Sequence, residues 1–152
     1  MVCHALDFLD FVFGPIETVR AFAGNQANAY RPEDIVAASY RFASGIYGSG
    51  AWCFAADVDE EYNEIIGASG RIRFSTYAPV PIRLCRGGTM EEIPIADPPH
   101  VHQPMIQSIV NELNGSGHCL STGDSGARTA WVLDEILREF RAGDALPRES
   151  SR

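Results

Sequence analysis

The chain has 152 residues, of which 45% are hydrophobic, enough for one domain with a buried core. Its formal net charge of −8 argues against nucleic acid and anionic membranes as partners, because both bind clustered cations. No apolar run approaches the roughly 20 residues that span a bilayer, and no signal peptide opens the chain. We therefore expect a cytoplasmic globular protein.

The first fourteen residues, MVCHALDFLDFVFG, predict an amphipathic helix that ends at Gly14-Pro15. His4 and Asp7 are three residues apart, so on a helix they share a face and can touch. A histidine can move a proton near neutral pH, and a neighbouring carboxylate fixes its tautomer. His4 is therefore a candidate acid–base residue. The alternative is a helix-start histidine beside an exposed aspartate.

A strand is predicted over residues 16–23, and a polar loop follows over residues 24–31. In this loop Asn25 and Tyr30, with Asn28 and Arg31, are candidates to hydrogen-bond a polyol, and exposed turn chemistry is the alternative. The next strand, residues 35–43, alternates apolar and polar side chains. One face of it carries the apolar set Val36, Ala38, Tyr40 and Phe42, and the other carries Ser39 and Arg41.

Further strands are predicted by alternation and by glycine-containing turns, over residues 47–56, 61–66, 71–76, 81–86 and 92–95. Short turns between neighbouring strands imply a largely antiparallel sheet. Two helices close the chain. One begins at Pro104 and ends at Asn114-Gly115, and the other begins near Thr122 and reaches about Phe140.

These elements predict a single α+β domain over residues 1–141, with a frayed tail over residues 142–152. Three helices can cover only one face of the sheet, so the other face needs a partner. We therefore expect a homodimer formed through the open sheet face. The large apolar side chains that must be covered on one face or the other are Tyr40, Phe42, Trp52, Phe54, Phe74 and Tyr77.

Four histidines and scattered cysteines raise the question of a metal. His100 and His102 are two apart in an extended segment, and such a pair points to opposite sides. Together with His4 and His118 they fit no standard zinc spacing, so we expect no metal site. A metal-dependent hydrolase built on these histidines is the weakest hypothesis.

Two absences bear on catalysis. The chain contains no lysine, and arginine cannot replace lysine as a general base because it stays protonated. The chain also has no G-x-G-x-x-G between a strand and a helix, since Gly45, Gly48 and Gly50 fall within a strand pattern. We expect this chain alone to bind no dinucleotide cofactor.

Several short segments resemble, in order and spacing, the C-terminal domain of the glucose–fructose oxidoreductase / inositol dehydrogenase (Gfo/Idh/MocA) family, from His4 to about Phe140. The family carries D-x-x-x-H-x-x-D at its first helix, and its last two positions match His4 and Asp7. The first aspartate would precede Met1 and is absent. The other matching segments are P-E-D at 32–34, A-S-G at 43–45, G-A-S-G at 67–70, Q-P-M-I at 103–106 and T-G-D-S at 122–125.

The resemblance implies a dihydrodipicolinate-reductase-like C-terminal domain of the glyceraldehyde-3-phosphate-dehydrogenase-like type. This fold class is α+β, with a largely antiparallel, open-faced sheet and helices packed on one face. The resemblance also implies an N-terminal Rossmann domain, absent from this chain, that binds NAD or NADP and supplies a catalytic lysine from an E-K-P motif. Family members pair through the sheet face as dimers or tetramers.

Complete enzymes of this family oxidise a hydroxyl of a sugar, a cyclitol or a similar polyol to a ketone, or run the reverse. His4 matches their acid–base histidine, and Asp7 would support that helix or contact substrate. The chain is then the substrate-binding and oligomerisation half of an oxidoreductase, inactive alone. The alternative is a free-standing, non-catalytic α+β domain that dimerises or binds a ligand.

Overall fold

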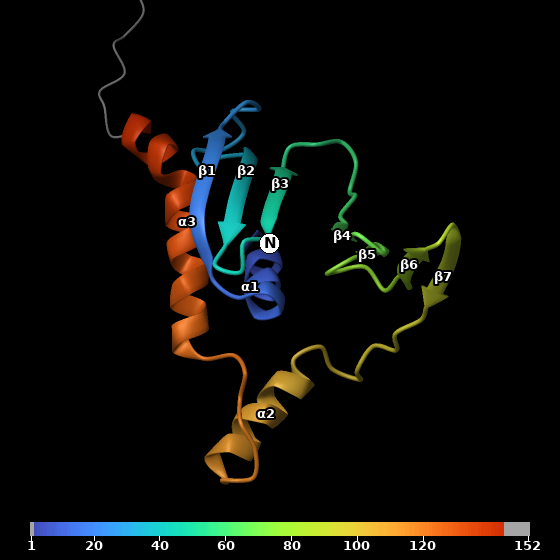
Figure 1. Cartoon of the computed structure of the whole chain (residues 1–152). Coiled ribbons are helices and arrows are strands. Elements are labelled where there is room, and N and C mark those ends of the chain that lie inside the picture. The colour runs from blue at the N-terminus through green and yellow to red at the C-terminus, as the bar shows by residue number, and fades with distance from the viewer. Residues whose placement is uncertain (1, 145–152) are drawn as a thin grey trace, which may run out of the picture. The chain divides into compact units, whose positions relative to one another are not determined.

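The computed structural model describes residues 2–144. These residues fall into two compact units. Unit 1 combines the chain up to Val58 with the chain from Gly123 onwards, and unit 2 is Asp59–Thr122. The elements are α1 (Val2–Phe13), β1 (Ile16–Gly24), β2 (Ile35–Phe42), β3 (Tyr47–Cys53), β4 (Asn63–Gly67), β5 (Gly70–Phe74), β6 (Ile82–Arg86), β7 (Thr89–Ile93), α2 (Gln103–Leu113) and α3 (Gly123–Asp144), labelled in Figure 1.

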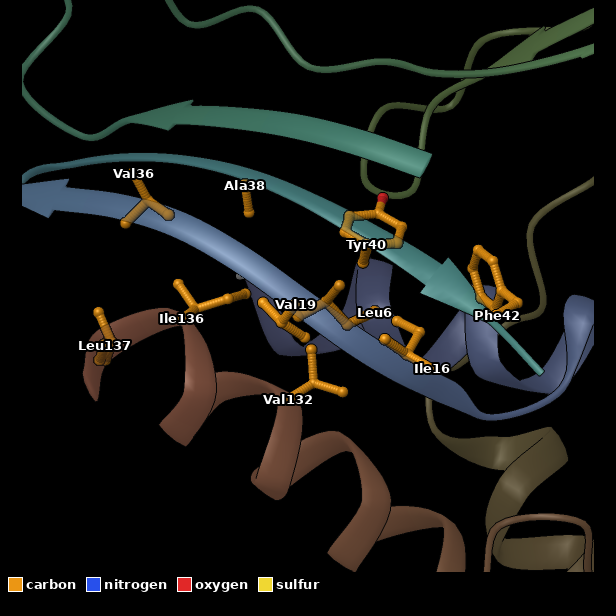
Figure 2. Packing of buried hydrophobic residues seen from close by; sticks show 10 residues of the cluster. All are labelled: Leu6, Ile16, Val19, Val36, Ala38, Tyr40, Phe42, Val132, Ile136 and Leu137. Atoms are coloured by element: carbon orange, nitrogen blue, oxygen red, sulfur yellow. The ribbon is translucent and has the colours of Figure 1, made fainter. Parts of the chain in front are cut away.

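Unit 1 is a three-stranded antiparallel sheet in the order β1-β2-β3, with α1 and α3 packed on one face. The alternation predicted for β2 is confirmed, because every second residue from Val36 to Phe42 is buried. Figure 2 shows these side chains meeting residues of both helices in one core. That core consists of Leu6, Ile16, Val19, Val36, Ala38, Tyr40, Phe42, Val132, Ile136 and Leu137.

The first helix ends where the sequence predicts. Gly14 adopts a φ of +84°, a left-handed conformation that glycine reaches without steric cost, and its N–H donates to the carbonyl of Asp10 at 2.9 Å. At the turn between β2 and β3, the Ser44 hydroxyl donates to the carbonyl of Phe13 at 3.1 Å. The C-terminal end of α1 is thus fixed beside that turn.

Unit 2 contains a four-stranded antiparallel sheet in the order β4-β5-β6-β7, and helix α2. The predicted turns are confirmed. Gly67 pairs with Gly70 across a two-residue loop, and Gly87 and Gly88 have φ values of +56° and +79°. Positive φ at both central residues defines the type I′ turn that suits the twist of a hairpin.

The structure differs from the sequence prediction in three places. The seven strands form two antiparallel sheets rather than one. β7 begins at Thr89 because the turn at Gly87-Gly88 has only two residues. Helix α3 continues to Asp144, beyond the predicted boundary at residue 141, while residues 145–152 of the predicted tail lie outside the described residues.

The outer face of the unit 1 sheet is less aromatic than the sequence suggests. Tyr40 and Phe42 are buried, and Trp52 packs against the same core. The side chains that point away from the helices include Phe22 and Tyr47, which are 82% and 79% exposed. Within residues 2–144, no helix is long and apolar enough to cross a membrane.

Candidate active site

Helix α1 presents the predicted pair of residues in different surroundings. His4 is exposed and Asp7 is half-buried. The Oδ1 atom of Asp7 accepts a hydrogen bond from the hydroxyl of Thr129 on α3, at 3.1 Å. Thr129 is buried, so this contact belongs to the packing between the two helices. Asp7 is therefore attached to the scaffold, while His4, one turn earlier, remains accessible from solvent.

A second contact between α1 and α3 was not predicted from the sequence. Asp10 is only 6% exposed, and its carboxylate accepts two hydrogen bonds at 3.1 and 2.7 Å from Nε and Nη2 of Arg128. The hydrogen bond to Asp10 raises the pKa of Arg128, as do the charges of Asp10, Asp124 and Asp7. The sequence contains one sign of this ion pair, because Asp10 lies among the buried apolar residues of the first helix, where a carboxylate needs a partner.

His4, Asp7 and Asp10 form a series spaced by three residues along α1. Exposure decreases along this series, from the exposed His4 through the half-buried Asp7 to the buried Asp10. A histidine at the exposed end can give a proton to a ligand or take one from it, whereas the carboxylates nearer α3 are engaged in hydrogen bonds. This arrangement suits acid–base chemistry at His4 on a rigid helix.

The predicted polar loop is organised by its own side chains. The amide nitrogen of Asn25 donates to the carbonyls of Tyr30 and Pro32, the latter at 2.8 Å, and its oxygen accepts from the Asn28 N–H at 2.8 Å. The buried carboxylate of Asp34 accepts from two further N–H groups of the loop, at 2.8 and 2.7 Å. These contacts agree with the turn chemistry that the sequence offers as the alternative to polyol binding.

The structure brings Asn25 and Tyr30 together in the β1–β2 loop. This loop and the C-terminal end of α1 lie at opposite ends of the β1–β2 ladder. Gly24 pairs with Ile35 at the loop end of the β1–β2 ladder, and Ile16 pairs with Phe42 at the other end, next to the turn that holds Phe13. The Tyr30 side chain is 47% exposed. The loop and the His4 series thus stand on separate elements of unit 1.

The remaining histidines lie in unit 2. His100 and His102 line an open pocket with Gln103 and Ile106, and the Nδ1 atom of His118 lies 3.4 Å from a carboxylate oxygen of Glu112. No three histidine, cysteine or acidic side chains gather in metal-binding geometry within the described residues. The glycines considered for phosphate binding precede no helix, because Gly48 and Gly50 lie in β3 and Gly45 in the turn before it.

Comparison with known proteins gives a consistent result. Residues 1–73 match the GFO/IDH/MocA C-terminal domain. A relative named Oxidoreductase P35, from Formosa agariphila, is 32% identical over 107 residues, which are 70% of this chain and 32% of the relative.

Two solved structures share the fold. The WlbA dehydrogenase from Bordetella pertussis, solved in complex with NADH and UDP-GlcNAcA, is 25% identical with a TM-score of 0.68, over 93% of this chain and 41% of that one. The aldose-aldose oxidoreductase from Caulobacter crescentus, complexed with glycerol, is 18% identical with a TM-score of 0.77, over 93% and 44%.

The chain spans about a third of the length of the curated relative and less than half of either solved chain. The matching segment begins with α1 and contains His4, Asp7 and the whole β1-β2-β3 sheet. The chain therefore belongs to the GFO/IDH/MocA oxidoreductase family, as a C-terminal domain of that family.

Proposed function

We propose that this chain is the substrate-binding and oligomerisation domain of an NAD(P)-dependent oxidoreductase that acts on a hydroxyl of a sugar, a cyclitol or a similar polyol. The observation that carries the proposal is His4. It is exposed at the first turn of α1, within the segment that matches the family. Its imidazole takes the proton of the reacting hydroxyl while hydride leaves for the cofactor, or returns that proton in the reverse direction.

The substrate class is supported by what the relatives bind. WlbA was solved with NADH and a UDP-sugar, and the Caulobacter enzyme with glycerol. Asp7, Asn25 and Tyr30 remain our candidates for substrate contacts, and Tyr30 is 47% exposed.

The proposal requires two partners. One is a Rossmann domain that binds NAD or NADP and supplies the lysine that this chain lacks. The other is a second copy of the chain, which would cover the outer face of the unit 1 sheet. By itself the chain is inactive, and its location is the cytoplasm.

The first experiment determines the mass of the native gene product with an antibody raised against this chain. A band at about twice the mass of the chain, as an added domain of typical size would give, supports a two-domain enzyme. A band at the mass of the chain itself supports the free-standing alternative and directs the search to a separate cofactor subunit.

The second experiment assays the purified native product with NAD or NADP against aldoses, inositols and UDP-sugars. Replacing His4 with Gln is expected to lower kcat by about 10²–10⁴-fold, the usual contribution of a general acid–base group. His118→Gln, which changes an exposed histidine of unit 2, is the matched control and leaves kcat unchanged. Full activity of the His4→Gln variant would disprove the catalytic role.

A further inference from the structure

Two consecutive residues of α3 hold two acidic residues of α1 that lie one turn apart. Arg128 binds Asp10 with hydrogen bonds at 2.7 and 3.1 Å, and Thr129 binds Asp7 at 3.1 Å. Asp10 and Thr129 are 6% and 7% exposed, so each contact has one buried partner between the helices, while the Arg128 side chain is 44% exposed. Along the axis of α1 the two anchor points are about 4.5 Å apart.

The apolar contacts of α1 do not by themselves fix how the helix is rotated. Leu6 is almost fully buried in the core, and Leu9 and Phe13 pack against it from the same helix. Burial of apolar surface is non-directional, so these contacts specify the rotation of the helix less sharply than directional hydrogen bonds do. A bidentate pair between guanidinium and carboxylate has a fixed planar geometry, and so it allows much less rotation.

We infer that Arg128 and Thr129 are positioning residues. They fix the rotation of α1 about its axis and its position along α3, and thereby set the direction in which the His4 side chain points. The contact of Ser44 with Phe13 holds the C-terminal end of α1, and the two contacts with α3 hold the next turns toward His4. Because α1 is continuous from Val2 to Phe13, the orientation fixed at Asp7 and Asp10 is transmitted to His4 one turn earlier.

The chemistry of the pair points the same way. Pairing with the half-exposed Arg128 recovers little more than the cost of removing the Asp10 carboxylate from water, and an apolar pair of similar volume would stabilise the fold about as well. What the pair adds is a single allowed arrangement of the two helices. This inference rests on the proposed role of His4, because only an acid–base histidine needs its direction fixed.

The test examines the direction of His4 rather than turnover, so its failure can be distinguished from failure of the proposed function. In the chain labelled at histidine, the Cε1–Hε1 signal of His4 is assigned with His4→Gln and compared among Thr129→Val, Thr129→Ser and Arg128→Lys at one pH. The signals of His100, His102 and His118, which belong to unit 2, are the internal reference. Arg141→Gln, an exposed position of the same helix, is the control variant.

Thr129→Val removes the hydroxyl at nearly constant volume, and Arg128→Lys keeps the charge but loses the two-point hydrogen bonding. Both are expected to shift the His4 signal and to speed amide exchange across Leu6–Asp10 by about fivefold or more, while exchange in the middle of α3 is unchanged. Thr129→Ser restores the wild-type signal.

A role in stability alone predicts a different result. The midpoint of unfolding would then fall in Thr129→Val and Arg128→Lys, but the His4 signal would stay in place below that midpoint. That outcome, or an equal shift of the His4 signal in Arg141→Gln, overturns the inference.

Discussion

The ring of Tyr40 on β2 lies against the backbone of Gly48, its register partner on β3. A Cβ atom added to Gly48 would lie 2.2 Å from Cε2 of that ring and less than 3 Å from two further ring atoms. Burial raises the pKa of Tyr40, as expected for a phenol that packs in the core. The glycine is therefore required for space, not for its backbone conformation.

Gly48→Ala is expected to destabilise the protein by about 1–3 kcal/mol, because the buried Tyr40 ring must move to make room for the methyl group. The midpoint of urea unfolding, followed by far-ultraviolet circular dichroism, measures the change. Gly126→Ala, on α3, is the control. The added methyl meets nothing within 4 Å there, and alanine favours a helix, so this change is expected to stabilise by about 0.5–1 kcal/mol. Equal effects of the two substitutions would contradict the steric argument.

The buried carboxylate of Asp10 makes a second prediction about stability. Arg128→Gln leaves this carboxylate without its cation and is expected to cost about 1–3 kcal/mol, less than for a fully buried pair because Arg128 is itself 44% exposed. In a double-mutant cycle with Asp10→Asn, the two costs are expected to be less than additive. Simple additivity in urea unfolding would mean that the two residues do not interact.

Much of the secondary structure follows from local sequence. The alternation in β2 identifies Val36 and Phe42 as core residues, and both are buried there. Gly14 marks the end of α1, since its positive φ is accessible mainly to glycine. The type I′ turn at Gly87-Gly88 is likewise encoded by two adjacent residues. In each case the cause lies within a few residues of its effect.

The contacts that hold the candidate site together could not be predicted in this way. Arg128 and Asp10 are 118 residues apart in the sequence, and nothing in either segment specifies the other. The role of Asp34 is similar, because the two N–H groups that donate to its carboxylate are brought there only when the polar loop folds back. The requirement for glycine at position 48 is also non-local, because the space for a side chain there is occupied by the ring of Tyr40 on the neighbouring strand.

Unit 2 offers a prediction about pH. The carboxylate of Glu61 accepts from the Ser75 hydroxyl at 2.5 Å and from the Thr76 N–H at 3.0 Å. Burial opposes ionisation of Glu61, but these hydrogen bonds outweigh burial and hold its pKa below the ordinary value of 4.5. The ionised form thus favours the folded hairpin. Its contribution is complete above the unfolded pKa and is lost as the pH falls through the lower pKa of the folded state.

Amide exchange in β4 and β5, measured from pH 7 down to pH 3 and corrected for intrinsic rates, tests this expectation. Protection is expected to fall on the acid side in the wild type, whereas Glu61→Gln is expected to start lower and to change less. Glu91→Gln, at an exposed position of β7, is the control and keeps the wild-type profile. An unchanged acid dependence in Glu61→Gln would assign the effect to other carboxyl groups.

The outer face of the β1-β2-β3 sheet tests the proposed dimer. Phe22 is paired with Ala37, which is paired with Ala51, so one large ring stands beside two small side chains on this face. Phe22 is 82% exposed, so its ring would gain free energy by being buried against a second copy of the chain. Light scattering at micromolar concentration is expected to give twice the mass of the chain for the wild type and the mass of one chain for Phe22→Glu. Phe11→Glu, which changes an aromatic residue of α1 that is 63% exposed, is expected to leave the dimer intact. If the wild type is already monomeric, the sheet face does not bind a second copy, and another partner must cover Phe22.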